Sequence, residues 1–172
     1  FMETLNSTLT SEQILYVMTN RDLSQIISVT SSKSQEHTIL RDSILPGLLE
    51  NLSKNIHETY PQKFFESGIV FSKGAPIKET SSLACVTASE ETHFSEMKAV
   101  LQSLLRIGFN IKCETKTLPS HVLFSQGRVA EIVVNKKTVG YIGELDSKVL
   151  ENFRIRTKVV GFEIKLSGLI FD

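Results

Sequence analysis

The sequence lacks the features that mark membrane, metal-binding and disulfide-linked proteins. Its apolar runs extend over only a few residues, whereas a membrane-spanning helix needs roughly 20. There are two cysteines, Cys85 and Cys113, and no CxxC pair, which disfavours a zinc site. Each cysteine lies in an apolar, strand-like run, so a role as a small hydrophobic residue is favoured over a disulfide or a metal ligand.

An excess of charge of one sign is also missing. The 19 basic and 19 acidic residues cancel, which argues against a domain that binds nucleic acid through a large positive field. Apolar residues make up 41% and charged residues 22% of the 172 residues, as in an ordinary globular protein. We therefore expect a single domain over residues 1–172. Because residue 1 is Phe and strand-like sequence starts at once, we expect a piece of a longer protein.

Common catalytic and nucleotide-binding motifs do not occur. There is no GxSxG nucleophile motif, no GxxxxGK[ST] phosphate loop and no GxGxxG dinucleotide motif. The four histidines show neither HxxxH nor HExxH spacing: they are His37, His57, His93 and His121. Each is more simply a surface or capping residue than a ligand. Motifs alone therefore identify no catalytic residue and no metal ligand.

Residues 40–71 carry the clearest structural pattern. Apolar residues at spacings of three and four predict a helix with one buried face: Leu45, Leu48, Leu49, Leu52 and Ile56. Pro46 suits the first turn of that helix because its missing N–H has no partner there. After Tyr60-Pro61, a β-rich run over residues 64–71 predicts a strand that ends at Ser72-Lys73-Gly74.

The remaining elements are predicted from the same kinds of pattern. Upstream we expect strands at 3–9 and 25–29, a helix at 11–18 and a polar loop at 30–37. Downstream we expect strands at 82–88, 110–115 and 159–166, a helix at 93–107 between Thr92 and Gly108, a hairpin of 129–134 and 138–142 turning at Asn135-Lys136, and a short helix capped by Asp146. Strands in runs and hairpins indicate an α+β fold with a mainly antiparallel sheet flanked by helices.

Several segments, in order, resemble one known family. They are HTILRDSILPGLLENLSKN, YPQKFFESGIVF, HFSEMKAVLQSLLRIGF, GRVAEIVVNKKTVGYIGELDSKVLENFRI and VVGFEIKL. Together they resemble the beta subunit of phenylalanyl-tRNA synthetase of the archaeal and eukaryotic type, over nearly the whole chain. LRDSILPGLLE and VGYIGEL are the most specific matches. The resemblance implies the C-terminal catalytic-like module of that subunit, which has the class II aminoacyl-tRNA synthetase core fold but does not make the adenylate.

The same resemblance implies where catalytic residues would lie. In an active class II core, the strand of the second motif is followed by an arginine and, two residues later, by a glutamate. Here Ser72 and Gly74 stand at these positions, and removing one such charged contact typically costs a factor of ~100 or more in rate. Lys73 is offset by one residue and would point to the other side of an extended chain.

No arginine begins the third-motif helix after residue 166 either. We therefore predict no catalytic residue, no bound cofactor and no metal ligand. The candidates for a degenerate pocket are Arg41, Glu66, Ser72 and Lys73, of which Arg41 is favoured as a structural residue that donates hydrogen bonds to nearby carbonyls.

The resemblance also implies a function and partners. We expect a structural and assembly module that supports the catalytic alpha subunit, in an (αβ)2 enzyme that attaches phenylalanine to tRNA(Phe) with ATP and magnesium used by the alpha subunit. We expect a cytoplasmic protein that contacts neither a membrane nor DNA. Two alternatives stay open: a degenerate pocket that binds or turns over a nucleotide or amino acid through Arg41, Glu66 or Lys73, and a free-standing regulatory paralogue of the synthetase fold.

Overall fold

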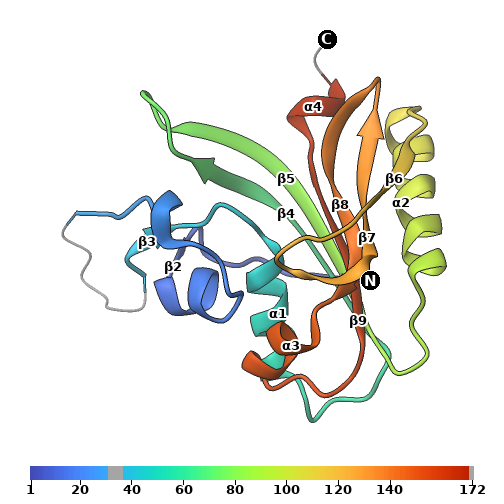
Figure 1. Cartoon of the computed structure of the whole chain (residues 1–172), viewed down its shortest axis with the longest axis horizontal. Helices are drawn as coiled ribbons and strands as arrows, with labels where there is room; N and C mark the ends of the chain where they lie inside the picture. The colour runs from blue at the N-terminus through green and yellow to red at the C-terminus, as the bar shows by residue number, and fades with distance from the viewer. Residues whose placement is uncertain (31–36, 171–172) are drawn as a thin grey trace.

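A seven-stranded sheet forms the centre of the computed structural model (Figure 1), which describes residues 1–30 and 37–170. In spatial order its strands are β1 (Met2–Glu3), β4 (Gln62–Ser72), β5 (Lys78–Ala88), β9 (Val159–Lys165), β8 (Lys137–Leu145), β7 (Phe124–Val134) and β6 (Glu114–Leu118). Of the described pairings, only that of β1 with β4 is parallel. The predicted α+β fold with a mainly antiparallel sheet is confirmed.

Helices cover both faces of this sheet (Figure 1). On one face lie α1 (Leu45–Lys54), the short π-helix η1 (Gln13–Val17) and α3 (Ser147–Asn152). On the other face lies α2 (Phe94–Phe109). The smaller elements are the 3-10 helix η2 (Leu23–Gln25), the two-stranded sheet of β2 (Leu9–Thr10) and β3 (Ile39–Leu40), and α4 (Ser167–Ile170) after β9.

The alternation of side chains along each strand builds a separate core on each face. On the α1 face, the leucines of α1 pack with Val86 and Val159. On the α2 face, residues of α2 such as Leu101 pack with Ile142 and Phe162. Full burial of each such side chain contributes about 1.5–3 kcal/mol, so the sheet is held between two helical layers.

Helix α1 follows its predicted pattern closely. Pro46 lies in the first turn, and the buried face carries Leu45, Leu48, Leu49 and Leu52. On the exposed face, Lys54 Nζ lies 2.6 Å from the carboxylate of Glu50, one helical turn away. The prediction for Ile56 was wrong: this residue lies beyond the end of the helix and is 37% exposed.

Two local predictions of chain reversal and capping are confirmed. Asn135 and Lys136 both have positive φ, 49° and 64°, as the type I′ turn of a two-residue hairpin requires. Asp146 caps α3, because its carboxylate accepts a hydrogen bond of 2.9 Å from the amide of Lys148. Both features depend on neighbouring residues only, which is why the sequence revealed them.

The predictions for the N-terminal region need correction. The strand expected at 3–9 is reduced to β1 and β2, since the amide and side chain of Asn6 bond to the carboxylate of Glu66 on β4 instead of to the backbone of that strand. At 25–29 only Ser28 forms an isolated bridge, to Ile39. The helix expected at 11–18 is the π-helix η1, and residues 31–36 of the expected loop lie outside the described residues.

The ends of α2 also differ from the prediction. Its N-cap is His93 and not Thr92. The helix runs through Gly108 to Phe109, and its C-cap is Asn110, which adopts the left-handed conformation that asparagine tolerates. Because the amide of Ile111 still bonds to a helix carbonyl, the next strand, β6, begins four residues later than predicted.

We expect Leu48→Ala to lower the free energy of unfolding by about 2–5 kcal/mol, because it leaves a cavity beneath α1. Leu48 is 0% exposed. Urea denaturation followed by circular dichroism measures the change. Leu5→Ala is the matched control, since Leu5 is 85% exposed, and it should change stability by less than about 0.5 kcal/mol. Equal effects of the two substitutions would contradict the assigned core.

Candidate functional site

A buried ion pair anchors the chain just before α1 to the sheet. Arg41 Nη1 lies 2.5 Å from Glu66 Oε1 on β4, and Arg41 Nε donates a 3.0 Å hydrogen bond to the carbonyl of Ile69. Arg41 and Glu66 are 5% and 1% exposed. Any side chain at Gly68 would collide with the guanidinium of Arg41, so the glycine lets this arginine lie flat against β4.

The first turn of α1 is held by a carboxylate from the far end of the sequence. Ile44, the N-cap residue, has an apolar side chain that cannot accept a hydrogen bond from the helix. Glu163 on β9 takes over this role: it accepts from the amides of Ile44 and Leu45 at 3.0 and 3.1 Å and from the Ser43 hydroxyl at 2.7 Å. A carboxylate is favoured there because the amino end of a helix carries a partial positive charge.

Glu163 is half-buried at the wall of the cavity, and its environment changes its acidity. Burial raises the pKa of Glu163 above its ordinary value, and the nearby charge of Asp42 acts in the same direction. The hydrogen bonds from Ser43, Ile44 and Leu45 oppose this shift of the pKa. Glu163 therefore has a structural role, while its burial disfavours the charged form of the carboxyl group.

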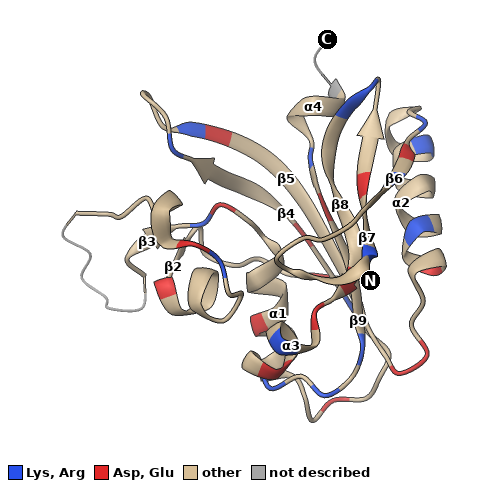
Figure 2. Ribbon diagram, in the orientation of Figure 1, with Lys and Arg blue, Asp and Glu red and all other residues tan. Residues whose placement is uncertain are grey.

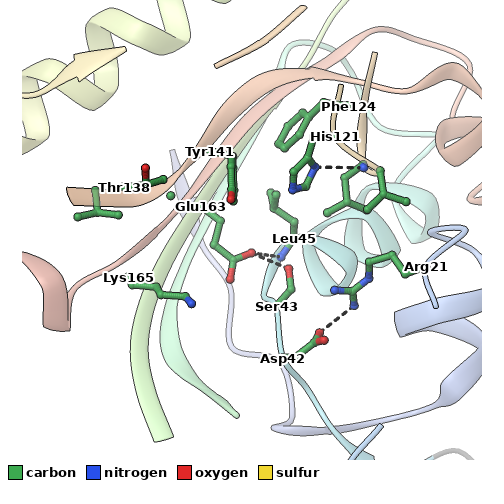
Figure 3. A pocket seen from close by; sticks show the side chains of 14 residues that line it. Arg21, Asp42, Ser43, Leu45, His121, Phe124, Thr138, Tyr141, Glu163 and Lys165 are labelled. Atoms are coloured by element: carbon green, nitrogen blue, oxygen red, sulfur yellow. Dashed lines mark hydrogen bonds and ion pairs between the residues drawn. The ribbon is translucent and has the colours of Figure 1, made fainter. Parts of the chain in front are cut away.

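A cavity of about 340 Å³ lies beside this junction, on the α1 face of the sheet (Figure 3). Its walls come from strands β8 and β9, from residues 42–45 and from residues 121–124. Figure 3 shows Leu45 and Ser43 in the middle of the view, with Glu163 reaching toward them from β9. Segments that are far apart in the sequence thus meet around one space.

His121 is fixed in one orientation at the wall of this cavity. Its Nδ1 accepts a 3.3 Å hydrogen bond from the amide of Leu123, so in the neutral ring the proton is on Nε2. The ring centroid lies 4.5 Å from that of Tyr141 and 5.1 Å from that of Phe124. Burial, together with the charge of Arg21, lowers the pKa of His121 below its ordinary value, which favours the neutral form.

Arg21 and Asp42 form an ion pair on the opposite wall of the cavity. Arg21 Nη2 lies 2.8 Å from Asp42 Oδ1, and the Tyr16 hydroxyl donates a 3.0 Å hydrogen bond to Asp42 Oδ2. The guanidinium also lies over the Tyr16 ring, 4.8 Å from its centroid. Burial and the charge of Asp42 raise the pKa of Tyr16 to about 12, so this tyrosine stays a hydrogen-bond donor.

The four candidate residues from the sequence fall into two separate places. Arg41 and Glu66 meet in the buried pair described above, and Arg41 does donate to a carbonyl. Ser72 ends β4, and Lys73 follows it on the surface, where its Nζ contacts the carbonyl of Ser24 at 2.5 Å. The walls of the cavity, in the part of the chain that the structure describes, include none of the four.

Sequence reasoning missed the residues that line the cavity. Glu163 carried a visible signal, because a charged residue in the apolar run VVGFEIKL must be either exposed or paired. His121 and Tyr141 carried no such signal. They come from separate segments, and only the folded sheet brings their rings together.

The thiols and charges give no sign of a metal site or of one strongly charged face. Within residues 1–30 and 37–170, no group of three or more His, Cys, Asp or Glu side chains could hold a metal ion. Both cysteines are free, and burial raises the pKa of Cys85 to about 12, in keeping with a hydrophobic role.

Figure 2 shows basic and acidic residues interspersed along helices and strands. No helix in the described ranges is long and apolar enough to cross a membrane.

Comparisons with known proteins agree on one family. The family described as "Phenylalanyl tRNA synthetase beta chain CLM domain" matches residues 1–166. The phenylalanine–tRNA ligase beta subunit of Methanocaldococcus jannaschii is 36% identical over 170 residues, which cover 96% of this chain and 31% of the relative. That of Pyrococcus abyssi is 37% identical over 172 residues, covering 97% and 30%. The chain therefore spans about a third of the length of these curated relatives.

A solved structure shares the fold. A pyrrolysyl tRNA synthetase from Desulfitobacterium hafniense superposes with a TM-score of 0.76, covering 99% of this chain and 62% of that one. The sequences are only 18% identical, so this likeness concerns the fold alone. It agrees with the expected class II synthetase core.

We expect the buried pair to be strongly coupled. Glu66→Leu should lower the free energy of unfolding by about 3–5 kcal/mol, because it leaves the Arg41 guanidinium buried without its partner. Adding Arg41→Met should restore part of this loss, since the apolar pair needs no charge compensation, whereas the bonds from Asn6 to Glu66 stay lost in both variants. Urea denaturation of the single and double variants measures both steps. Additive losses in the double variant would contradict the coupling.

Glu163→Gln tests the pH dependence of the α1 junction. Because burial raises its pKa, Glu163 keeps its proton in the folded chain at a pH where the unfolded chain has lost it. Raising the pH from about 4, near the ordinary pKa of glutamate, should therefore lower the stability of the native sequence relative to Glu163→Gln until the raised pKa is passed. Urea denaturation at several pH values measures this difference. A relative stability that grows with pH would contradict the sign.

Proposed function

Because this chain belongs to the family of the phenylalanyl-tRNA synthetase beta chain CLM domain, we propose that it is a non-catalytic structural module of a phenylalanine–tRNA ligase. In this proposal, residues 1–172 form one catalytic-like module in the C-terminal part of the beta subunit. The module keeps the class II fold and has lost the chemistry of adenylate formation. Its role is to support the assembly in which another subunit is active.

The observation that carries the proposal is the residue at the end of β4. An active class II core needs an arginine immediately after the strand of its second motif, to stabilise the negative charge that develops at the α-phosphate. Strand β4 instead ends at Ser72, which has no charge, and Gly74 stands where the glutamate would be. Lys73 contacts the Ser24 carbonyl on the surface, so it does not replace the missing arginine.

The conformation of the α1 face gives further support. Arg41 is held by Glu66, and the start of α1 is held by Glu163. In these contacts the carboxylates of Glu66 and Glu163 stabilise the fold. The alternative in which Arg41, Glu66 and Lys73 turn over a nucleotide or an amino acid therefore has less support, because the first two bond to each other and the third lies on the surface.

The proposed partners follow from the family. The beta subunit pairs with a catalytic alpha subunit as (αβ)2, in the cytoplasm, and the whole enzyme charges tRNA(Phe) with phenylalanine. ATP and magnesium act in the alpha subunit. The zero net charge of this chain supports a division in which other regions make most of the tRNA contacts.

An exchange assay tests the loss of catalysis. The full-length beta subunit combined with its alpha subunit should catalyse phenylalanine-dependent ATP–pyrophosphate exchange, whereas the 172-residue chain alone should show none. Ser72→Arg combined with Gly74→Glu should not create activity in this chain, because the arginine of the third motif is missing as well. Exchange by the chain alone would overturn the proposal.

A further inference from the structure

Three hydrogen-bond donors line the cavity beside α1 with no partner among the described residues. They are the Tyr141 hydroxyl, the Nε2–H of His121 and the ammonium group of Lys165. Figure 3 shows the His121 ring and the Tyr141 hydroxyl directed into the space above Leu45, with Lys165 at the edge. The two rings are half-buried, whereas Lys165 is exposed, so the donors reach from the wall of the cavity to its mouth.

The carboxylates around the same space are already in use. Both oxygens of Asp42 accept hydrogen bonds, one from Arg21 and one from Tyr16. Both oxygens of Glu163 accept from the Ser43 hydroxyl and the first amides of α1. The charged acceptors are therefore satisfied whereas the three donors are not, which suits a ligand that accepts hydrogen bonds.

The charge balance points in the same direction. Arg21 neutralises Asp42 within an ion pair of 2.8 Å. Glu163 is bound by the amino end of α1, where the helix dipole partly compensates a negative charge. Among the described residues that line the cavity, Lys165 is then the one Lys or Arg without an ion-pair partner. A hydrogen bond between an ammonium and a carboxylate is stronger than one between neutral groups.

Flat and apolar groups form the rest of the wall. The centroid of the His121 ring lies 5.1 Å from that of Phe124 and 4.5 Å from that of Tyr141. Leu45 also lines the space. A flat apolar group can pack against such rings. The volume of about 340 Å³ falls within the range of roughly 300–1,000 Å³ found for small-molecule sites.

We propose that this cavity binds a small organic carboxylate with a flat apolar body. The carboxylate accepts hydrogen bonds from Lys165, Tyr141 and the Nε2–H of His121, and the apolar body packs against the aromatic rings and Leu45. This role is independent of the proposed assembly function, because it rests on the cavity alone. It uses none of the four residues suggested by the sequence.

Isothermal titration calorimetry with 3-phenylpropanoate on the 172-residue chain tests the proposal. We expect saturable binding with a Kd below about 1 mM. Lys165→Ala and Tyr141→Phe should each weaken binding about tenfold or more, since each removes a hydrogen bond to a charged group. The matched controls are Lys116→Ala on β6 and Tyr60→Phe, which lie outside the cavity and should leave the Kd unchanged. Circular dichroism checks that each variant is folded.

Two further ligands test which chemical group is recognised. The neutral amide 3-phenylpropanamide should bind at least about tenfold more weakly, because it lacks the charge that Lys165 recognises. L-phenylalanine distinguishes the source of the carboxylate: tighter binding than 3-phenylpropanoate indicates an amino acid, and weaker binding indicates a simple carboxylic acid. The proposal is overturned by absence of saturable binding, by equal binding of the amide, or by unchanged affinity in both cavity variants.

Discussion

The contact between Glu163 and the first turn of α1 is the interaction on which the α1 face depends. It joins the last strand of the sheet to a helix almost 120 residues earlier in the chain. Because Ile44 has no capping side chain, the amides at the start of α1 would otherwise be buried without partners. The carboxylate therefore fixes where α1 begins and how the leucines of this helix approach the sheet.

This arrangement has a direct consequence for function. Arg41 and Glu66 are a second connection between the same segment and the sheet, so residues 41–45 are tied to β4 on one side and to β9 on the other. A charged group that is held by a buried partner costs several kcal/mol to release. The α1 face is thus held in one shape, which supports the proposed role as a supporting module.

The helices and turns show how far local patterns reach. Leu48 and Leu52 of α1 and the Asn135-Lys136 turn were predicted correctly, because periodicity and turn chemistry act over a few residues. The N-terminal strands were not, because Asn6 bonds to a carboxylate on β4 that no local pattern reveals. Tertiary contacts override weak strand propensity.

The sequence by itself determined the fold class, the family resemblance and the serine at position 72, where the resemblance implies an arginine in an active core, since each depends on residue identity along the chain. Only the tertiary structure decided the candidate ligand cavity. His121, Tyr141 and Glu163 lie in different segments, and their side chains meet because β8 and β9 are neighbours and residues 121–124 and 42–45 lie around the same cavity. The physical reason is that contacts between residues far apart in the sequence leave no repeating pattern in it. The geometry of such a site exists only in the folded chain.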